Sequence, residues 1–192
     1  MKQIKTAILT IAAALTLSSC NYNGMVEREE AVSQAWSNVE NQYQRRADLI
    51  PNLVSTVKGY AAHESETLEA VTAARAKSTS INVDPTTATA EQMNQWMEAQ
   101  NEVGSALGRL IAISENYPEL KANQNFLELQ KQLEGTENRI STERRKYNEQ
   151  VKRFNVSIRR FPTSIIAGMF GFEKMTMFEA QEGAEVAPVV EF

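Results

Sequence analysis

The sequence has few of the residue types on which most enzyme active sites depend. Among its 192 residues are one cysteine, Cys20, and one histidine, His63. A single cysteine excludes an internal disulfide. The pair His63-Glu64 begins like the zinc-binding helix motif of metalloproteases, but Thr67 stands where the second histidine must be. Because a Gly-x-Ser-x-Gly motif and a glycine-rich phosphate loop are also missing, we predict no catalytic site, no metal site and no cofactor.

An excess of positive charge is missing as well. The chain carries 20 basic and 24 acidic side chains. Cleavage after Ser19 would remove two lysines and no acid, which leaves 18 basic against 24 acidic side chains and a net charge of −6. Proteins that bind nucleic acid are usually strongly basic, so we expect no nucleic-acid partner. The motifs identify no small-molecule substrate.

The apolar runs are too short for a spanning helix, which needs about 20 apolar residues. The main run follows Lys5, extends without a charge from Thr6 to Leu17 and ends at Ser18-Ser19-Cys20. This order of basic, short apolar and small residues is typical of a secretory signal. In an ordinary secretory signal of this kind, Cys20 would have no role of its own.

The stretch Leu17-Ser18-Ser19-Cys20 resembles a bacterial lipobox, in which the cysteine thiol receives a diacylglyceryl group and becomes the new N-terminus. Two or three acyl chains on one residue hold a protein stably at a membrane. We therefore predict a cleaved signal over 1–19, lipidation at Cys20 and a lipid-anchored tether over 20–24. The expected location is the extracytoplasmic face of a membrane in a bacterial cell envelope.

Apolar and aromatic residues from Val32 to Tyr60 recur in alternating steps of four and three, except that Arg46 occupies one of the expected positions, and this pattern is typical of one face of a helix. Pro51 conflicts with that pattern, because an interior proline costs about 3 kcal/mol. Asp48 is suited to cap a new helix with Pro51 in its first turn. The alternatives are one kinked helix and a break near Asp48, and the break is slightly favoured because it gives more even lengths.

Further helices are predicted along the rest of the chain. The second segment ends near Lys77, before a stretch of turn formers. A capping box at Thr89-Ala-Glu-Gln92 starts a helix that stops before Tyr117-Pro118. The last helix, from Glu119 to Arg159, has a seven-residue seam typical of a bundle or coiled coil, formed by Phe126, Leu133, Ile140, Tyr147 and Phe154.

No alternating strand pattern bounded by turn residues occurs. The predicted fold is therefore all-α, an antiparallel up-and-down four-helix bundle over 25–160. A cap segment and an irregular C-terminal tail follow over 161–192. The apolar stretch from Phe161 to Phe172 either folds back to close one end of the core or stays exposed as a partner site. From Glu179 onward we expect an extended, mobile tail.

Six arginines are candidates for binding an anion or a partner. Arg45 and Arg46, beside Asp48, suit a fork for a carboxylate or phosphate, and the alternative is pairing with acidic neighbours at an end of the bundle. The other four lie at the basic end of the last helix, at Arg144, Arg145, Arg159 and Arg160.

Four helices that run up, down, up and down from the anchor would return this basic end to anionic headgroups. If the first two segments form one helix, the basic end points away from the membrane. A scaffold role is the alternative in both cases, because cations at a helix C-terminus compensate its dipole.

Many short and unusual sequence motifs in this chain resemble the signature of the LemA family. In the first half they are Ala35-Trp36-Ser-Asn-Val39, Gln44-Arg45-Arg46-Ala-Asp48-Leu-Ile-Pro-Asn-Leu-Val54, Val57-Lys-Gly-Tyr60, His63-Glu64 and Ala73-Ala-Arg75. In the second half they are Tyr147-Asn148, Phe154-Asn155, Phe161-Pro162 and Phe170-Gly171-Phe172. The resemblance implies a four-helix antiparallel bundle held at a bacterial membrane, in a family whose molecular activity is not established.

Many members of that family have a spanning N-terminal helix, and this chain differs by carrying the lipobox instead. We expect a non-catalytic scaffold that contacts other envelope proteins. One alternative is an enzyme, which would need paired buried carboxylates with raised pKa values. Another is a binder of lipid or cell-wall fragments, which would need a sizeable apolar cavity between the helices.

Overall fold

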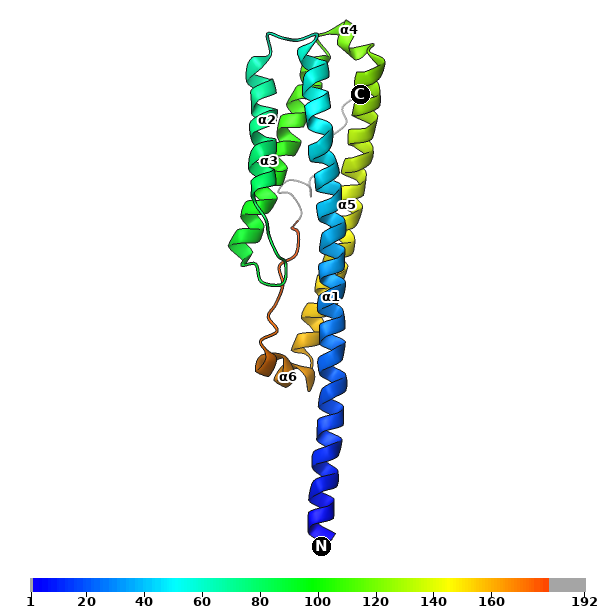
Figure 1. The fold of residues 1–192 in the computed structure, drawn as a ribbon, viewed down its shortest axis with the longest axis vertical. Coiled ribbons are helices and arrows are strands. Elements are labelled where there is room, and N and C mark those ends of the chain that lie inside the picture. Colours follow the sequence, from blue (N-terminus) through cyan, green and yellow to red (C-terminus); the bar gives the residue numbers. More distant parts are fainter. Residues whose placement is uncertain (1, 180–192) are drawn as a thin grey trace, which may run out of the picture.

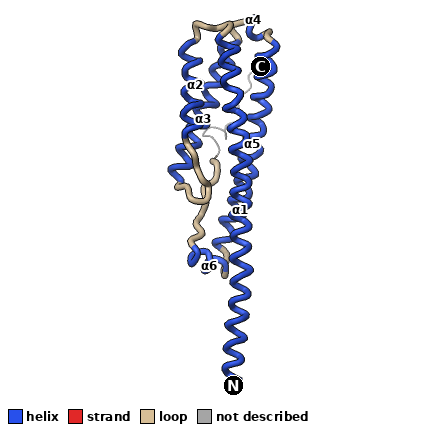
Figure 2. Tube along the Cα trace, viewed as in Figure 1, coloured by secondary structure: helices blue, strands red, loops and turns tan. Residues whose placement is uncertain are grey.

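The computed structural model describes residues 2–179, with side chains from residue 22 onward. The predicted tail beyond Glu179 lies outside the described residues. Within them, all regular structure is helical and no strand occurs (Figure 2), so the all-α prediction is confirmed. The helices are α1 (Lys2–Lys58), α2 (Ser65–Ser80), α3 (Ala90–Ser114), α4 (Pro118–Lys121), α5 (Gln124–Arg159) and α6 (Thr163–Phe170). Among the described residues, no helix is both long and apolar enough to cross a membrane.

The four long helices run alternately up and down, as predicted. The helix α1 packs along α5, and α2 packs along α3 (Figure 1). The pair α2 and α3 accompanies only the upper part of α1, while the C-terminal end of α5 and the short α6 lie beside its lower part. The basic end of α5 is therefore returned to the side from which α1 enters the bundle.

The favoured break near Asp48 is wrong, because α1 continues through Pro51 to Lys58. The side chain of Asp48 accepts a hydrogen bond from Gln44 Nε2 at 2.8 Å, within the helix. Ile50 and Leu53, on either side of the proline, are both buried. Burial of two such side chains contributes about 1.5–3 kcal/mol each, which offsets the roughly 3 kcal/mol cost of an interior proline.

The alternative of one kinked helix through to Lys77 is also wrong. The chain turns at residues 59–64, where α1 ends and α2 begins. His63 is exposed in that turn. The turn is tied to the end of α1 by hydrogen bonds from the amides of Tyr60 and Ala61 to the Val57 carbonyl, at 3.0 and 2.8 Å. Residues 2–179 therefore contain four long helices, although the chain first turns later in the sequence than expected.

The other predicted helix ends are largely confirmed. The capping box is present, because the Gln92 amide donates to Thr89 Oγ1 at 3.2 Å and the Thr89 amide donates to Gln92 Oε1 at 2.9 Å. The predicted start of the last helix at Glu119 is wrong, because the chain breaks after α4. Asn123 caps the new helix by accepting a hydrogen bond from the Phe126 amide at 3.0 Å.

The seven-residue seam of α5 is buried throughout, so that prediction is confirmed. Its residues belong to two separate apolar clusters. The upper core contains Phe126 and Leu133, together with Ile50, Leu53, Val57, Leu107 and Leu110. The lower core contains Ile140, Tyr147 and Phe154, together with Met25, Trp36, Trp96, Ile158 and Phe178.

Candidate functional site

The lower end of the bundle is completed by the segment that follows α6, residues 173–179, which we call the C-terminal strap. It returns upward along the bundle to the lower part of α3, where the ring centroids of Phe178 and Trp96 are 6.1 Å apart (Figure 1). Its side chains Met175 and Phe178 are buried in the lower core. The ring of Phe178 stacks on Trp36 with centroids 5.9 Å apart and meets Tyr147 edge-on at 5.2 Å. The strap thus covers part of the lower core beside α1 and α5.

Two asparagines on α5 hold the strap. Asn155 Nδ2 donates to the Met175 carbonyl at 2.9 Å, and the Met175 amide donates to Asn155 Oδ1 at 2.9 Å. Asn148 makes the same pair of bonds with Phe178, at 2.9 and 2.8 Å. Seven residues of helix rise about 10.5 Å and three residues of extended chain span about 10 Å, so the two asparagines match the two strap residues in spacing.

The side chains next to these asparagines support the same contact. The Tyr147 hydroxyl donates to the Thr176 carbonyl at 3.1 Å, and burial raises the pKa of that phenol. Arg144 Nη2 donates to the Glu179 carbonyl at 3.2 Å, and its guanidinium lies over the Phe178 ring, 4.7 Å from the ring centroid. The motifs Tyr147-Asn148 and Phe154-Asn155 therefore belong to one surface of α5 that binds the strap.

The replacement Asn155→Ala should lower the free energy of unfolding by about 2–3 kcal/mol, because it leaves the buried amide and carbonyl of Met175 without partners. Asn138→Ala, at an exposed asparagine on the same helix, is the control and should change stability by less than about 0.5 kcal/mol. Urea unfolding of the full chain measures both. Equal stabilities of the two variants would show that the strap contributes little to the fold.

The helix α6 has one face on the bundle and one face outside it. Ala167 is buried in the lower core, and Ile166 and Phe172 pack against it. The outer side chains are large and apolar, and they are exposed: Phe161, Ile165, Met169 and Phe170. One face of this stretch therefore folds back onto the lower core, and the other face stays exposed.

The end of α6 follows from its glycine. Gly171 has φ +76°, in the left-handed region that favours glycine, and the Phe172 amide returns to the Ala167 carbonyl at 3.0 Å. Beyond this turn, Tyr22 of α1 contacts the aromatic pair that flanks Gly171. Its ring centroid lies 4.7 Å from that of Phe170 and 5.9 Å from that of Phe172.

The candidate arginines fall into different environments. Arg159 and Arg160 are exposed at the end of α5, directly before α6. Arg145 is exposed on α5, whereas Arg144 is half-buried and holds the strap. The structure therefore groups only the last two arginines of α5 with the apolar outer face of α6.

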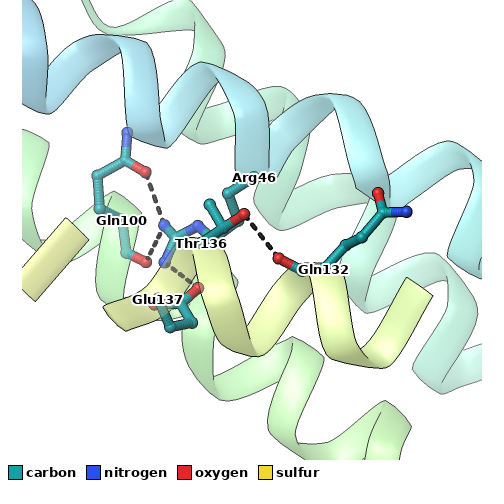
Figure 3. A network of polar contacts seen from close by, with 5 residues as sticks. All are labelled: Arg46, Gln100, Gln132, Thr136 and Glu137. Atoms are coloured by element: carbon teal, nitrogen blue, oxygen red, sulfur yellow. Dashed lines mark hydrogen bonds and ion pairs between the residues drawn. The ribbon is translucent and has the colours of Figure 1, made fainter. Parts of the chain in front are cut away.

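Arg46 is buried between the upper and lower cores. Its Nη2 donates to the carbonyl and to Oε1 of Gln100, both at 2.8 Å, and its Nη1 lies 3.2 Å from Glu137 Oε1 (Figure 3). The guanidinium also lies over the Tyr43 ring at 4.8 Å from its centroid. Arg45 is exposed, so the two arginines do not form a common fork. Arg46 pairs with an acidic residue, but it does so between the two cores and not at an end of the bundle, as the alternative expected.

A fully buried threonine completes this polar layer on α5. Thr136 donates to the Gln132 carbonyl at 2.8 Å, one turn earlier in the same helix (Figure 3). The apolar periodicity of α1 did not predict this polar layer, because Arg46 only interrupts an otherwise apolar helical face. A charged residue at an otherwise apolar position of the helical pattern indicates a buried charge.

The titratable groups of the described residues show no group of three or more metal-binding side chains. Burial raises the pKa of the Glu29 and Glu40 carboxyls, and the negative charge of Asp84 adds to the rise in both. The two carboxyls are eleven residues apart on α1, about 16 Å along the helix axis. They therefore do not form a pair that shares a proton. A cavity of about 260 Å³ beside Glu40 is also lined by Tyr43, Trp96 and Gln100.

Comparison with known proteins extends the resemblance seen in the sequence. Protein LemA of Metamycoplasma hominis is 27% identical over 175 residues, which cover 91% of this chain and 76% of that protein. Magnetosome protein MamQ of Magnetospirillum gryphiswaldense is 26% identical over 201 residues, which cover 96% of this chain and 74% of that protein. The model of the LemA family matches residues 35–192. Because that match spans most of the bundle, the strap and α6, the chain belongs to the LemA family.

Proposed function

We propose that this protein is a lipid-anchored, non-catalytic bundle at the extracytoplasmic face of a bacterial membrane, where it presents a rigid helical surface to other envelope proteins. The observation that carries the proposal is the position of Cys20 on α1. Met25, the first buried core residue among the described side chains of α1, follows only five residues later, about 7.5 Å along the helix. A lipid on Cys20 would therefore hold the bundle close to the bilayer surface.

The arrangement of the titratable groups among the described side chains supports the non-catalytic part. An enzyme of the kind considered above needs two carboxyls near each other, with pKa values that their surroundings push apart. Glu29 and Glu40 are too far apart for that, and His63 is exposed in a turn.

Replacement of Cys20 by serine should abolish lipidation, because a hydroxyl is a far weaker nucleophile than a thiolate. The native chain should incorporate radiolabelled palmitate and fractionate with membranes, and Cys20→Ser should do neither. Ser18→Ala keeps a small residue before the cleavage site and should behave as the native chain does. Equal labelling of the native chain and Cys20→Ser would contradict the proposal.

The same cells test the scaffold part of the proposal. Crosslinking of the native chain should join it to envelope proteins that are not joined to the Cys20→Ser chain. A crosslinked set that is identical for the two chains would show that anchoring does not bring the bundle to its partners.

A further inference from the structure

Large exposed apolar side chains are concentrated on α6 and the turn before it. The exposed fractions are 84% for Phe161, 58% for Ile165, 76% for Met169 and 61% for Phe170. Ile165 and Met169 are one turn apart and share a face of the helix. These are higher fractions than those of any other large apolar side chain among the described residues. A contiguous apolar patch of this kind marks a surface that is covered when the protein works.

The patch lies at the level of the predicted anchor. Tyr22, whose ring contacts Phe170 at 4.7 Å, follows Cys20 by two residues, about 3 Å along the helix axis. The outer face of α6 is therefore within about one helical turn of the predicted attachment point. A lipid on Cys20 would bring the headgroup layer to the same level as this apolar face.

Charge around the patch complements an anionic surface. Residues 150–172 contain no acidic side chain. They contain four exposed basic side chains: Lys152, Arg153, Arg159 and Arg160. The acidic side chains that border this stretch in the sequence are Glu149 on α5 and Glu173 after α6. On α1, Glu27 is five residues above Tyr22. An apolar face with aromatic residues beside basic side chains is the composition of segments that lie in the membrane interface.

We infer that α6 is a membrane-interface helix, whose outer face at Phe161, Ile165, Met169 and Phe170 lies in the boundary between anionic headgroups and acyl chains. The inference rests on the proposed function, because it takes the anchor at Cys20 as given. Arg159 and Arg160 contact the headgroups from the end of α5. Anchor, basic pair and apolar helix then form three contacts that fix the orientation of the bundle on the bilayer.

Depth-dependent fluorescence quenching tests the insertion. The full chain with Met169→Cys, processed and lipidated in bacterial cells, is labelled with nitrobenzoxadiazole and reconstituted into vesicles of phosphatidylglycerol and phosphatidylethanolamine that carry spin-labelled lipid. Quenching at position 169 should exceed that at Leu127→Cys by roughly threefold or more. Leu127 is an exposed apolar residue at the opposite end of α5. The native chain put through the same labelling reports any Cys20 that remains free.

The charge contribution is tested in the same vesicles. The double change Arg159→Gln and Arg160→Gln should reduce quenching at position 169. In the chain that keeps both arginines, quenching at position 169 should fall when phosphatidylcholine replaces phosphatidylglycerol. Equal quenching at positions 169 and 127 in a vesicle-bound chain would overturn the inference and leave the anchor intact. A native chain that does not bind vesicles would overturn both. Energy transfer between labels at position 169 on two chains, without lipid quenching, would assign the patch to a second copy and also overturn it.

Discussion

Replacement of Leu133 or Ile140 by alanine should lower the free energy of unfolding by about 2–5 kcal/mol in each case, as truncation of a buried aliphatic side chain does. Both side chains are 4% exposed on the seam of α5. Leu133 belongs to the upper core and Ile140 to the lower core. Each change removes methyl groups from a packed cluster and leaves a cavity that the surrounding helices fill only in part.

The two sites also test whether the cores are independent. Leu133 and Ile140 are about 10.5 Å apart along α5 and share no cluster, so the double variant should show the sum of the two losses to within about 0.5 kcal/mol. Urea unfolding followed by circular dichroism gives all three values. Leu127→Ala, at an exposed leucine on the same helix, should cost less than about 0.5 kcal/mol. Losses that small at both seam positions would place the seam outside the core.

Replacement of Arg46 by alanine should cost about 3–5 kcal/mol, the range expected when one partner of a buried charged network is removed. The change leaves the carbonyl and Oε1 of Gln100, which accept from Arg46 at 2.8 Å, without those donors. It also removes the contact with the Tyr43 ring. Glu137→Gln should cost about 1 kcal/mol or less, because the Glu137 side chain is 43% exposed and its ion pair is screened by solvent.

A third variant separates charge from shape at this site. Arg46→Lys keeps the positive charge, but a compact ammonium lacks the planar fork that reaches Gln100 and Glu137 together. We therefore expect a stability between those of the native chain and Arg46→Ala, measured by urea unfolding. A loss at Glu137→Gln as large as that at Arg46→Ala would show that the ion pair, rather than the bonds to Gln100, supplies most of the stabilisation.

Local chemistry was enough to predict several features of the fold. The capping box at Thr89 pairs groups three residues apart, and the proline at position 118 restricts its own neighbour, so both act whatever packs around them. The seam of α5 was readable for a similar reason, since a sustained seven-residue apolar repeat keeps one face toward a partner helix. The resemblance to the LemA family predicted the arrangement of the helices as well, because it rests on sequence motifs in both halves of the chain.

The buried network could not be predicted in this way. Whether Arg46 meets an anion or an internal acceptor depends on where α3 and α5 place Gln100 and Glu137, which are distant in the sequence. The strap is a similar case. Asparagines at 148 and 155 show the correct spacing on α5, but their partners in the strap lie 20 to 30 residues later. Neither site has a local signal that names its partner.

The amino-acid sequence by itself determined the helical class and the helix seams and pointed to Cys20 as the candidate anchor. Periodicity, capping and the order of residues in a secretory signal are all properties of neighbouring residues. Tertiary packing determined the passage of α1 through Pro51, the turn at residues 59–64 and the exposure of the outer face of α6. The reason is a balance of free energies: one lost backbone hydrogen bond competes with the burial of Ile50 and Leu53. That burial exists only once the other helices are in place.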